Sequence, residues 1–128
     1  LRLDISTIDG FIPIVKAYAG MHGELLEALT HTKIDGLVIE ALGAGNLPPD
    51  TVAPIKQMLA QKIPVVLVSR CFNGVADPVY SYEGGGKELH QLGVIFCDSI
   101  NSQKARIKLL IAHNKQLTGD KLKHFMEN

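Results

Sequence analysis

The sequence predicts a three-layer α/β fold, in which helices cover both faces of a doubly wound, four-stranded parallel sheet. Short apolar runs alternate with helical patterns along the chain, which is typical of parallel strands joined by crossover helices. The run at residues 37–41 is almost continuously apolar, which indicates a strand buried on both faces, and PVVLVS at residues 64–69 is a β-branched, apolar run typical of a strand. A length of 128 residues suits one compact core, so we expect a single domain over residues 1–128.

The first half of the chain predicts two strands, each followed by a helix. In order, these elements span residues 12–18, 21–31, 37–41 and 49–61. Pro13 should lie at a strand start or on an edge, since proline donates no hydrogen bond to a neighbouring strand. Leu25, Leu26 and Leu29 form the apolar stripe of the first helix. Pro54 lies near the start of the second helix, where it is tolerated or produces a kink.

The second half predicts two further strands and three helices. They are a strand at 64–69, a short helix ending at Gly93, a strand at 94–97, a long helix capped by Ser99 or Asn101, and a terminal helix beginning at Thr118. The buried residues of the last two helices are expected to be Ala105, Leu109 and Ala112, and then Leu122, Phe125 and Met126. The whole arrangement is flavodoxin-like or Rossmann-like.

Composition argues against several classes of partner. Thirteen basic and thirteen acidic side chains cancel without any run of like charge, so we expect no nucleic-acid or membrane partner. The longest apolar stretches are too short to span a bilayer, and the pattern of a signal peptide is missing, which favours a cytoplasmic protein. Cys71 and Cys97 lack nearby ligand-spaced partners, so we expect two separate thiols rather than a disulfide.

Two glycine-rich loops are the candidate functional site, because ligands of open α/β sheets bind outside the carboxyl ends of the strands. The loop at 42–48 contains GAGNLP, which departs from the dinucleotide-binding pattern because Pro48 replaces the third glycine. The loop at 70–86 leads into YEGGGKE at residues 82–88, which departs from the phosphate-loop pattern because Glu88 stands where serine or threonine is required. We therefore disfavour a nucleotide ligand.

Other motifs of catalysis are missing from the sequence. The five histidines, at positions 22, 31, 90, 113 and 124, have no metal-ligand spacing and are expected at the surface or boundary of helices. We therefore predict no metal and no cofactor. No serine or cysteine motif of a hydrolase is present, so a self-sufficient hydrolytic centre is not expected.

Three segments, DGLVIEALGAGNLPP, PVVLVSRCFNG and NSQKARIKLLIA, carry a resemblance to a known family. Their order and spacing resemble the C-terminal domain of bacterial-type L-asparaginases, of the asparaginase/glutaminase family, over residues 15–126. NSQKAR resembles the family's Asn-Pro-Gln-Lys-Ala-Arg helix opening, with Ser102 where many relatives have proline.

The resemblance implies an amidohydrolase that converts L-asparagine to L-aspartate and ammonia through a nucleophilic threonine and an acyl-enzyme. In that family the catalytic threonines, with their lysine and aspartate, belong to a larger N-terminal domain, in Thr-Gly-Gly-Thr and Gly-Thr-Asp-Thr contexts. Neither context occurs here. The resemblance therefore implies a C-terminal domain without its catalytic partner, inactive alone, that works with an N-terminal asparaginase domain in a homo-oligomeric parent enzyme, a dimer or tetramer.

The resemblance also implies two substrate-binding residues and no catalytic one in this chain. Asn46 matches the Gly-Asn-Leu asparagine that reaches the active site of a neighbouring subunit in periplasmic relatives. Glu83 matches a glutamate that contacts the substrate ammonium in some relatives. We expect Asn46 to project outward from a loop whose backbone is freed by Gly43 and Gly45 and then restricted by Pro48-Pro49. The alternatives are an Asn46 that bonds its own backbone and a solvated Glu83.

Two other functions remain open at this stage. One is a free-standing small-ligand-binding module, which would bind an amino acid without any second domain. The other is a structural assembly module, whose loops contact protein instead of ligand.

Overall fold

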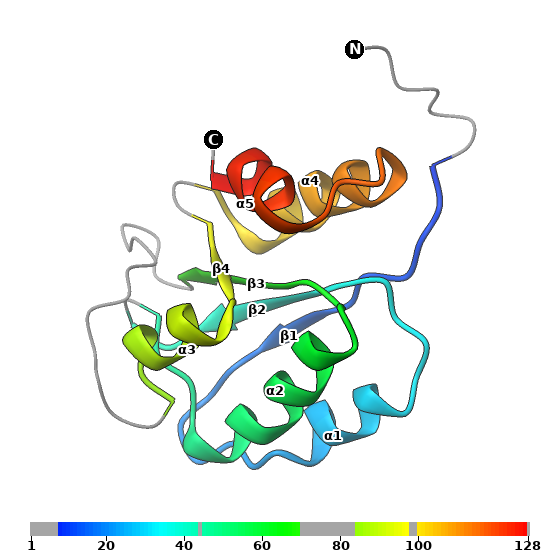
Figure 1. The fold of residues 1–128 in the computed structure, drawn as a ribbon. Helices are drawn as coiled ribbons and strands as arrows, with labels where there is room; N and C mark the ends of the chain where they lie inside the picture. The colour runs from blue at the N-terminus through cyan, green and yellow to red at the C-terminus, as the bar shows by residue number, and fades with distance from the viewer. Residues whose placement is uncertain (1–7, 44, 70–83, 98–99, 128) are drawn as a thin grey trace.

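The structure, a computed structural model, describes residues 8–43, 45–69, 84–97 and 100–127 (Figure 1). Its elements are β1 (Ile14–Lys16), α1 (Glu24–Thr30), β2 (Leu37–Ala41), the 3₁₀ helix η2 (Pro49–Thr51), α2 (Val52–Ala60), β3 (Val65–Ser69), α3 (Gly86–Leu92), β4 (Ile95–Phe96), α4 (Ser102–Asn114) and α5 (Gly119–Glu127). The predicted four-stranded parallel sheet with flanking helices is confirmed.

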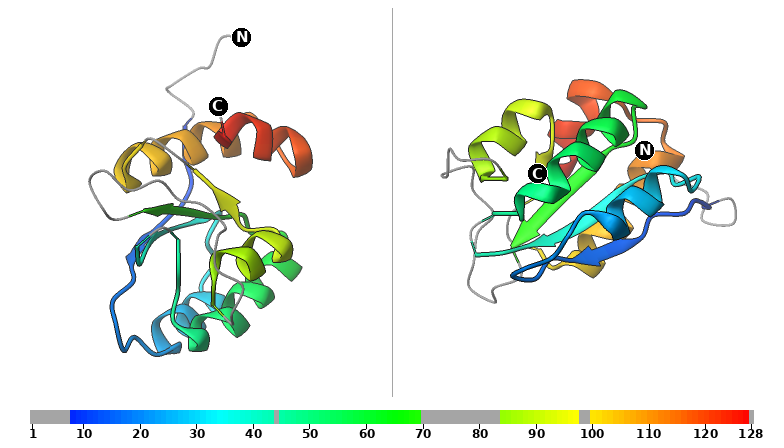
Figure 2. Two further views of the ribbon diagram at one scale, coloured as in Figure 1. Left: turned by 90° about the vertical axis from the view of Figure 1, so that its left-hand side faces the viewer. Right: turned by 90° about the horizontal axis from the view of Figure 1, so that it is seen from below.

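The strands lie in the sheet in the order of the sequence, β1-β2-β3-β4. Helices α1, α2 and α3 cover one face, while α4 and α5 cover the other (Figures 1 and 2). Because all strands are parallel, their carboxyl ends meet at one edge, which we call the carboxyl edge. There Ala41 of β2 pairs with Ser69 of β3, so the segments that follow these two residues start side by side.

The two central strands are buried on both faces, which the near-continuous apolar run at 37–41 predicts for β2. Leu37, Ile39, Val65 and Leu67 pack towards α1 and α2, whereas Val38, Val66 and Val68 pack towards α4 and α5. Each of these side chains is at most 1% exposed. The sheet is therefore a rigid base for the segments at its carboxyl edge.

Helix α4 begins as the sequence predicts. The side chain of Asn101 caps it by accepting the backbone N–H of Lys104 at 2.8 Å. The predicted stripe of Ala105, Leu109 and Ala112 is buried. In α5, Leu122 and Met126 are buried and Phe125 is half-buried, with the ammonium groups of Lys108 and Lys115 over its ring.

The first helix differs from the prediction in its length and in its buried face. It starts at Glu24 rather than at residue 21. Leu26 is buried and Leu29 half-buried, but Leu25 is 53% exposed, so its assignment to the buried stripe is wrong. Seven residues form only two turns, and the row that contains Leu26 and Leu29 is the one turned towards the core; Leu25 lies about 100° away from Leu26.

The second helix is divided at Thr51. Residues 49–51 form η2, and the α-helix begins only at Val52. A continuous α-helix from residue 49 would need an N–H at Pro54 to reach the carbonyl of Asp50, and proline has none. The first turn therefore closes with 3₁₀ hydrogen bonds, of which Thr51 N–H to Pro48 O at 3.0 Å is one.

Strand β1 is shorter than predicted, because Pro13 precedes it and regular pairing ends at Lys16. The segment before it is fastened to α4. Nδ2 of Asn114 donates to the carbonyl of Asp9 at 2.8 Å, and Nε of Arg106 donates to the carbonyl of Ile12 at 2.7 Å. Residues 9–12 are thereby held along α4, with Asp9 at the C-terminal end of the helix and Ile12 at Arg106.

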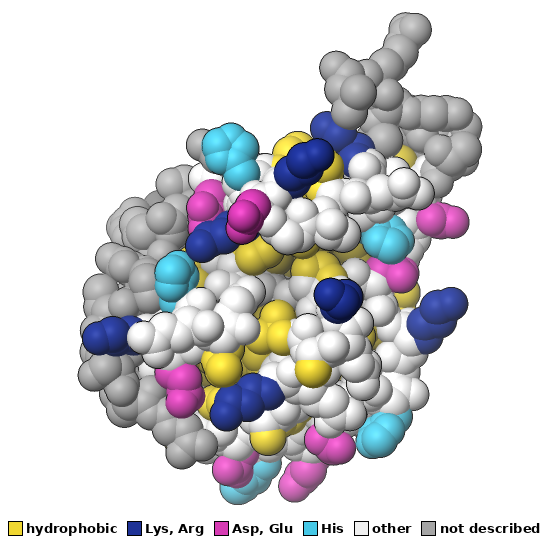
Figure 3. Space-filling view, in the orientation of Figure 1, with side chains coloured by type: hydrophobic (Ala, Val, Ile, Leu, Met, Phe, Trp, Pro, Cys, Tyr) yellow, Lys and Arg dark blue, Asp and Glu magenta, His cyan; other side chains and the backbone are white. Residues whose placement is uncertain are grey.

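The surface is mixed in charge, and Figure 3 shows basic and acidic side chains interspersed on one face. All five histidines are exposed, as predicted. Cys97 is buried and its thiol donates to the carbonyl of Met126, whereas Cys71 lies outside the described residues. Among the residues that the structure describes, no helix is long and apolar enough to cross a bilayer.

Candidate functional site

The loop at 42–48 leaves the carboxyl edge of β2 and immediately folds back on itself. Leu42 and Asn46 form an antiparallel bridge, in which each backbone N–H donates to the other's carbonyl at 2.9 Å. The N–H of Gly45 also donates to the carbonyl of Leu42 at 3.0 Å. Gly43 and Gly45 have φ values of +49° and +125°, which is the conformational freedom that this reversal requires.

The side chain of Asn46 is the notable feature of this loop. Its amide oxygen Oδ1 is buried and has no hydrogen-bond partner among the described residues. The expectation that Asn46 projects outward does not hold for this atom, although Asn46 as a whole is half-buried. Oδ1 does not bond the backbone of the described part of the loop either. An unpaired buried acceptor of this kind costs about 1–3 kcal/mol, which a matching donor would recover.

Ser69 fastens the first half of the loop to the neighbouring strand. Its hydroxyl donates to the carbonyl of Gly43 at 2.8 Å, across the ends of β2 and β3. A Cβ atom on Gly43 would lie 3.6 Å from Nδ2 of Asn46, so the carbonyl that Ser69 holds belongs to a residue in contact range of the asparagine. Sequence reasoning missed Ser69, although its position at the end of a buried strand could have indicated it.

The second half of the loop is fastened to the segment before α3. Leu47 is 2% exposed, and its N–H donates to the carbonyl of Gly84 at 2.8 Å. Gly84 is the chain neighbour of Glu83, which itself lies outside the described residues. The structure thus brings the backbone beside Asn46 into contact with the residue that follows Glu83.

A second polar group lies at the carboxyl edge, on the face covered by α4. The carboxylate of Glu40 accepts the hydroxyl of Ser102 and lies 3.6 Å from the ammonium of Lys16. Ser102 is 2% exposed, so its hydroxyl is used inside the protein. The sequence signal for this contact is the serine that stands where many asparaginases have proline.

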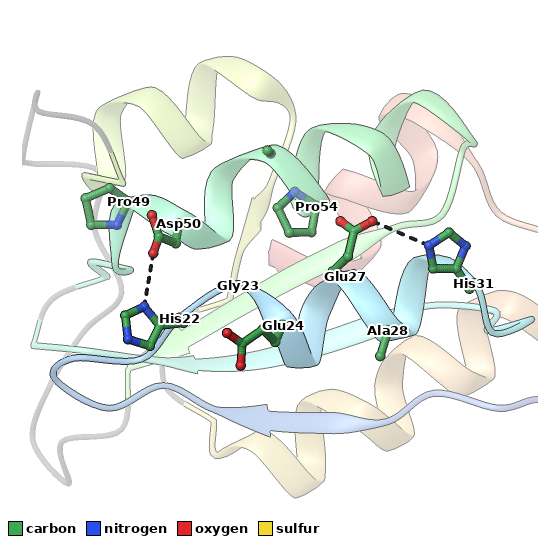
Figure 4. Close-up of a pocket in the computed structure, with 10 residues that line it drawn as sticks. His22, Gly23, Glu24, Glu27, Ala28, His31, Pro49, Asp50 and Pro54 are labelled. Carbon is green, nitrogen blue, oxygen red and sulfur yellow. Dashed lines mark hydrogen bonds and ion pairs between the residues drawn. The ribbon is translucent and has the colours of Figure 1, made fainter.

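A groove of about 760 Å³ lies between α1 and α2 (Figure 4). Nδ1 of His22 lies 3.3 Å from Oδ2 of Asp50, and Nε2 of His31 lies 3.4 Å from Oε1 of Glu27. All four side chains are more than half exposed, so such pairs contribute little to stability. Within the described ranges, no three His, Cys, Asp or Glu side chains converge to hold a metal ion.

Comparison with known proteins identifies the family of the chain. The family model described as "Glutaminase/Asparaginase C-terminal domain" matches residues 12–126. A "Probable L-asparaginase" of Deinococcus radiodurans is 43% identical over 108 residues, which cover 84% of this chain and 32% of that protein. A component of the glutamyl-tRNA(Gln) amidotransferase of Pyrococcus furiosus is 32% identical over 109 residues, which cover 83% of this chain and 24% of that protein.

A solved structure has the same fold. The "Probable Cytoplasmic L-asparaginase from Campylobacter jejuni" superposes with a TM-score of 0.80 and 25% identity, over 98% of this chain and 38% of that one. The chain thus spans between about a quarter and two fifths of the length of these relatives. The family match covers nearly the whole fold, including the loop at 42–48, and the chain therefore belongs to the glutaminase/asparaginase C-terminal domain family.

Proposed function

We propose that this chain is the C-terminal domain of an L-asparaginase, which hydrolyses L-asparagine to L-aspartate and ammonia, and that Asn46 completes the substrate site. The chain spans 32% of its L-asparaginase relative from Deinococcus radiodurans, which leaves room for a separate N-terminal domain. In this proposal that domain supplies the nucleophilic threonine, and the parent enzyme is a cytoplasmic homo-oligomer.

The observation that carries the proposal is the buried, unpaired Oδ1 of Asn46 at the carboxyl edge of the sheet, which has no partner among the described residues. An amide oxygen accepts a hydrogen bond without adding charge, so it suits the ammonium group of an amino-acid substrate or the hydroxyl of a catalytic residue. Such a donor would convert an energetic cost into a specific contact. One bond of this kind is worth about 0.5–1.5 kcal/mol net, which tunes substrate position rather than supplying catalysis.

Glu83 is the second substrate-binding residue of the proposal. The contact of Leu47 with Gly84 supports its pairing with Asn46, because the chain neighbours of both residues are hydrogen-bonded to each other. In the proposal its carboxylate faces the substrate ammonium, and Asn46 accepts a hydrogen bond from the same end of the substrate.

A second candidate is the amide-hydrolysing part of an amidotransferase, which passes ammonia to another reaction. The similarity to components of glutamyl-tRNA(Gln) amidotransferases favours it, since their identities of about a third cover four fifths of this chain. Both candidates require hydrolysis of a side-chain amide, so they differ in the amide substrate and in the use of ammonia.

Reconstitution tests the proposal. We expect the 128-residue chain mixed with a separately expressed N-terminal asparaginase domain to release ammonia from L-asparagine, whereas neither component alone does so. The same assay with L-glutamine separates the two candidates. Ammonia release by the 128-residue chain alone, or none from the mixture, would contradict the proposal.

Asn46→Ala tests the role of the loop in the same assay. We expect KM for L-asparagine to rise by about 2- to 13-fold, the equivalent of one net hydrogen bond. Gln57→Ala is the matched control, because Gln57 is an exposed amide in the middle of α2. Equal KM values for the two variants would exclude Asn46 from the substrate site.

A further inference from the structure

We infer that Glu88, on α3, is a positioning residue for Asn46, and that it acts through the backbone of Gly84. The expected effect of Glu88 on substrate binding rests on the proposed function. The expected effect of Glu88 on the position of the loop at 42–48 rests instead on four contacts between described residues. It also gives a role to the residue that breaks the phosphate-loop pattern in the sequence.

Asn46 is connected to Gly84 through Leu47. Asn46 is held by both of its backbone groups to Leu42, and the next residue, Leu47, donates its N–H to the carbonyl of Gly84 at 2.8 Å. Leu47 is also anchored in the core by its buried side chain. A shift of Gly84 is therefore transmitted to the residue adjoining Asn46.

Gly84 is connected in turn to Glu88. The backbone N–H of Gly84 donates to Oε1 of Glu88 at 3.1 Å. Both polar groups of Gly84 are thereby engaged, its N–H by α3 and its carbonyl by the loop at 42–48. Glu88 is half-buried, so its carboxylate is partly shielded from competing water.

This bond differs from ordinary helix capping. The N-cap of α3 is Gly85, and Glu88 is the third residue of the helix. In a capping box the third residue accepts the N–H of the N-cap itself. Here Glu88 reaches one residue further, to Gly84, which is the residue that contacts the loop. The bond therefore ties the loop to α3 rather than closing the helix alone.

The backbones of Gly84 and Leu47 approach each other closely. Gly84 has a φ of +82°, and a Cβ atom there would collide with the carbonyl oxygen of Leu47. The absence of a side chain allows the two segments to touch, and Glu88 then fixes the conformation that glycine alone leaves open. Glu88 thus restricts the segment whose position sets that of Asn46.

Amide hydrogen exchange in the 128-residue chain tests the structural half. We expect Glu88→Ala to raise the exchange rate of the Leu47 N–H by about 2- to 13-fold, the equivalent of one net hydrogen bond. Glu88→Gln keeps an acceptor oxygen and should leave the rate within about twofold. Glu24→Ala is the matched control, because Glu24 is also a first-turn glutamate, on α1.

Exchange at Leu89 distinguishes positioning from capping. The N–H of Leu89 donates to the carbonyl of Gly85 inside the first turn of α3. A rise confined to Leu47 supports the inference. An equal rise at Leu89 would mean that Glu88 merely stabilises the helix, and an unchanged rate at Leu47 would remove the connection; either result overturns the inference.

Kinetics of the reconstituted enzyme tests the functional half. We expect Glu88→Ala to raise KM for L-asparagine severalfold with kcat unchanged, the pattern of a lost binding interaction, and Glu88→Gln to restore it. In an Asn46→Ala background, Glu88→Ala should add nothing further. Additive effects would overturn the inference. An inert Asn46→Ala contradicts the proposed function instead, so the two failures are read from different variants.

Discussion

Ser102, the first residue of α4, donates its hydroxyl to Oε1 of Glu40 on β2, with 2.5 Å between the two oxygens, although the two residues are 62 positions apart in the chain. The contact fastens the start of α4 to the carboxyl edge of the sheet. A carboxylate at this place is favoured by the positive end of the helix dipole, in addition to the hydroxyl. The first turn of α4 and the end of β2 are thereby held as one unit.

Removing this hydroxyl should destabilise the domain. We expect Ser102→Ala to lower the free energy of unfolding by about 1.5–3 kcal/mol, because a hydrogen bond to a charged group is lost inside the protein. Urea unfolding of the 128-residue chain measures the change. Thr32→Ala is the control, since that hydroxyl is exposed and should cost about 0.5 kcal/mol or less. The double variant Glu40→Leu, Ser102→Ala should recover most of the loss; a further loss would show that the two residues act separately.

The neighbouring ion pair should matter much less. Lys16 and Glu40 lie 3.6 Å apart, but the Lys16 side chain is 71% exposed. We expect Lys16→Ala to change the free energy of unfolding by about 0–1 kcal/mol, because water screens the pair. The same urea titration, repeated at high salt, measures it. A loss as large as that of Ser102→Ala would mean that the ammonium, and not the hydroxyl, keeps Glu40 in place.

Substitutions at Gly84 and Gly93 should distinguish the free-energy cost of backbone strain from the cost of a steric clash. Gly84 and Gly93 both have positive φ, at +82° and +108°, but only Gly84 has another segment in the space of a Cβ. We expect Gly93→Ala to cost about 1–2 kcal/mol through strain alone. Gly84→Ala should cost clearly more, measured by the same unfolding curves. Equal losses of unfolding free energy in the two variants would show that the loop at 42–48 moves aside for a side chain at position 84 without further cost.

Ser69 should control the order of the loop more than the stability of the domain. We expect Ser69→Ala to raise the amide exchange rate of Gly45 several-fold, because the carbonyl of Gly43, in the same reversal of the loop, loses its donor. Ser69→Thr, which keeps the hydroxyl, should restore slow exchange. A rate at Gly45 that is the same in all three proteins would show that the Leu42–Asn46 bridge holds the loop unaided.

A substitution in the core under α4 should lower the free energy of unfolding more than the substitutions above. Leu109 is 1% exposed, and a Cβ on Gly36 would lie 2.9 Å from its Cδ2 atom, so the helix packs closely on the turn before β2. We expect Leu109→Ala to cost about 2–5 kcal/mol through lost burial and a residual cavity. Ile107→Ala, two residues earlier and 50% exposed, should cost about 1 kcal/mol or less. Thermal or urea unfolding of both variants measures the contrast.

The sequence was most informative where burial controls structure. The continuous apolar runs at 37–41 and 64–69 predicted β2 and β3 almost to the residue, because a strand buried on both faces contains almost only apolar side chains. Helix ends were less predictable, since they depend on single backbone donors. The missing N–H of Pro54, for example, moved the start of α2 to Val52.

The candidate site was predictable in place but not in construction. The glycines and Asn46 indicated the loop at 42–48, whereas its hydrogen bonds to Ser69 and Gly84 join residues that are far apart in the chain, 26 positions in the case of Ser69 and Gly43. No local pattern encodes such contacts. The burial of the Asn46 amide oxygen was likewise not predictable, because it depends on contacts of the folded loop and not on the local sequence.

The fastening of residues 9–12 along α4 has a consequence for how the domain is joined to other polypeptide. The chain enters at the amino-terminal edge of the sheet, beside Asn114, while Asn46 lies beyond the far end of β2. The five residues of β2 separate the two places by about 16 Å. A polypeptide joined ahead of residue 8 can thus be lengthened or shortened during engineering without altering the loop at 42–48.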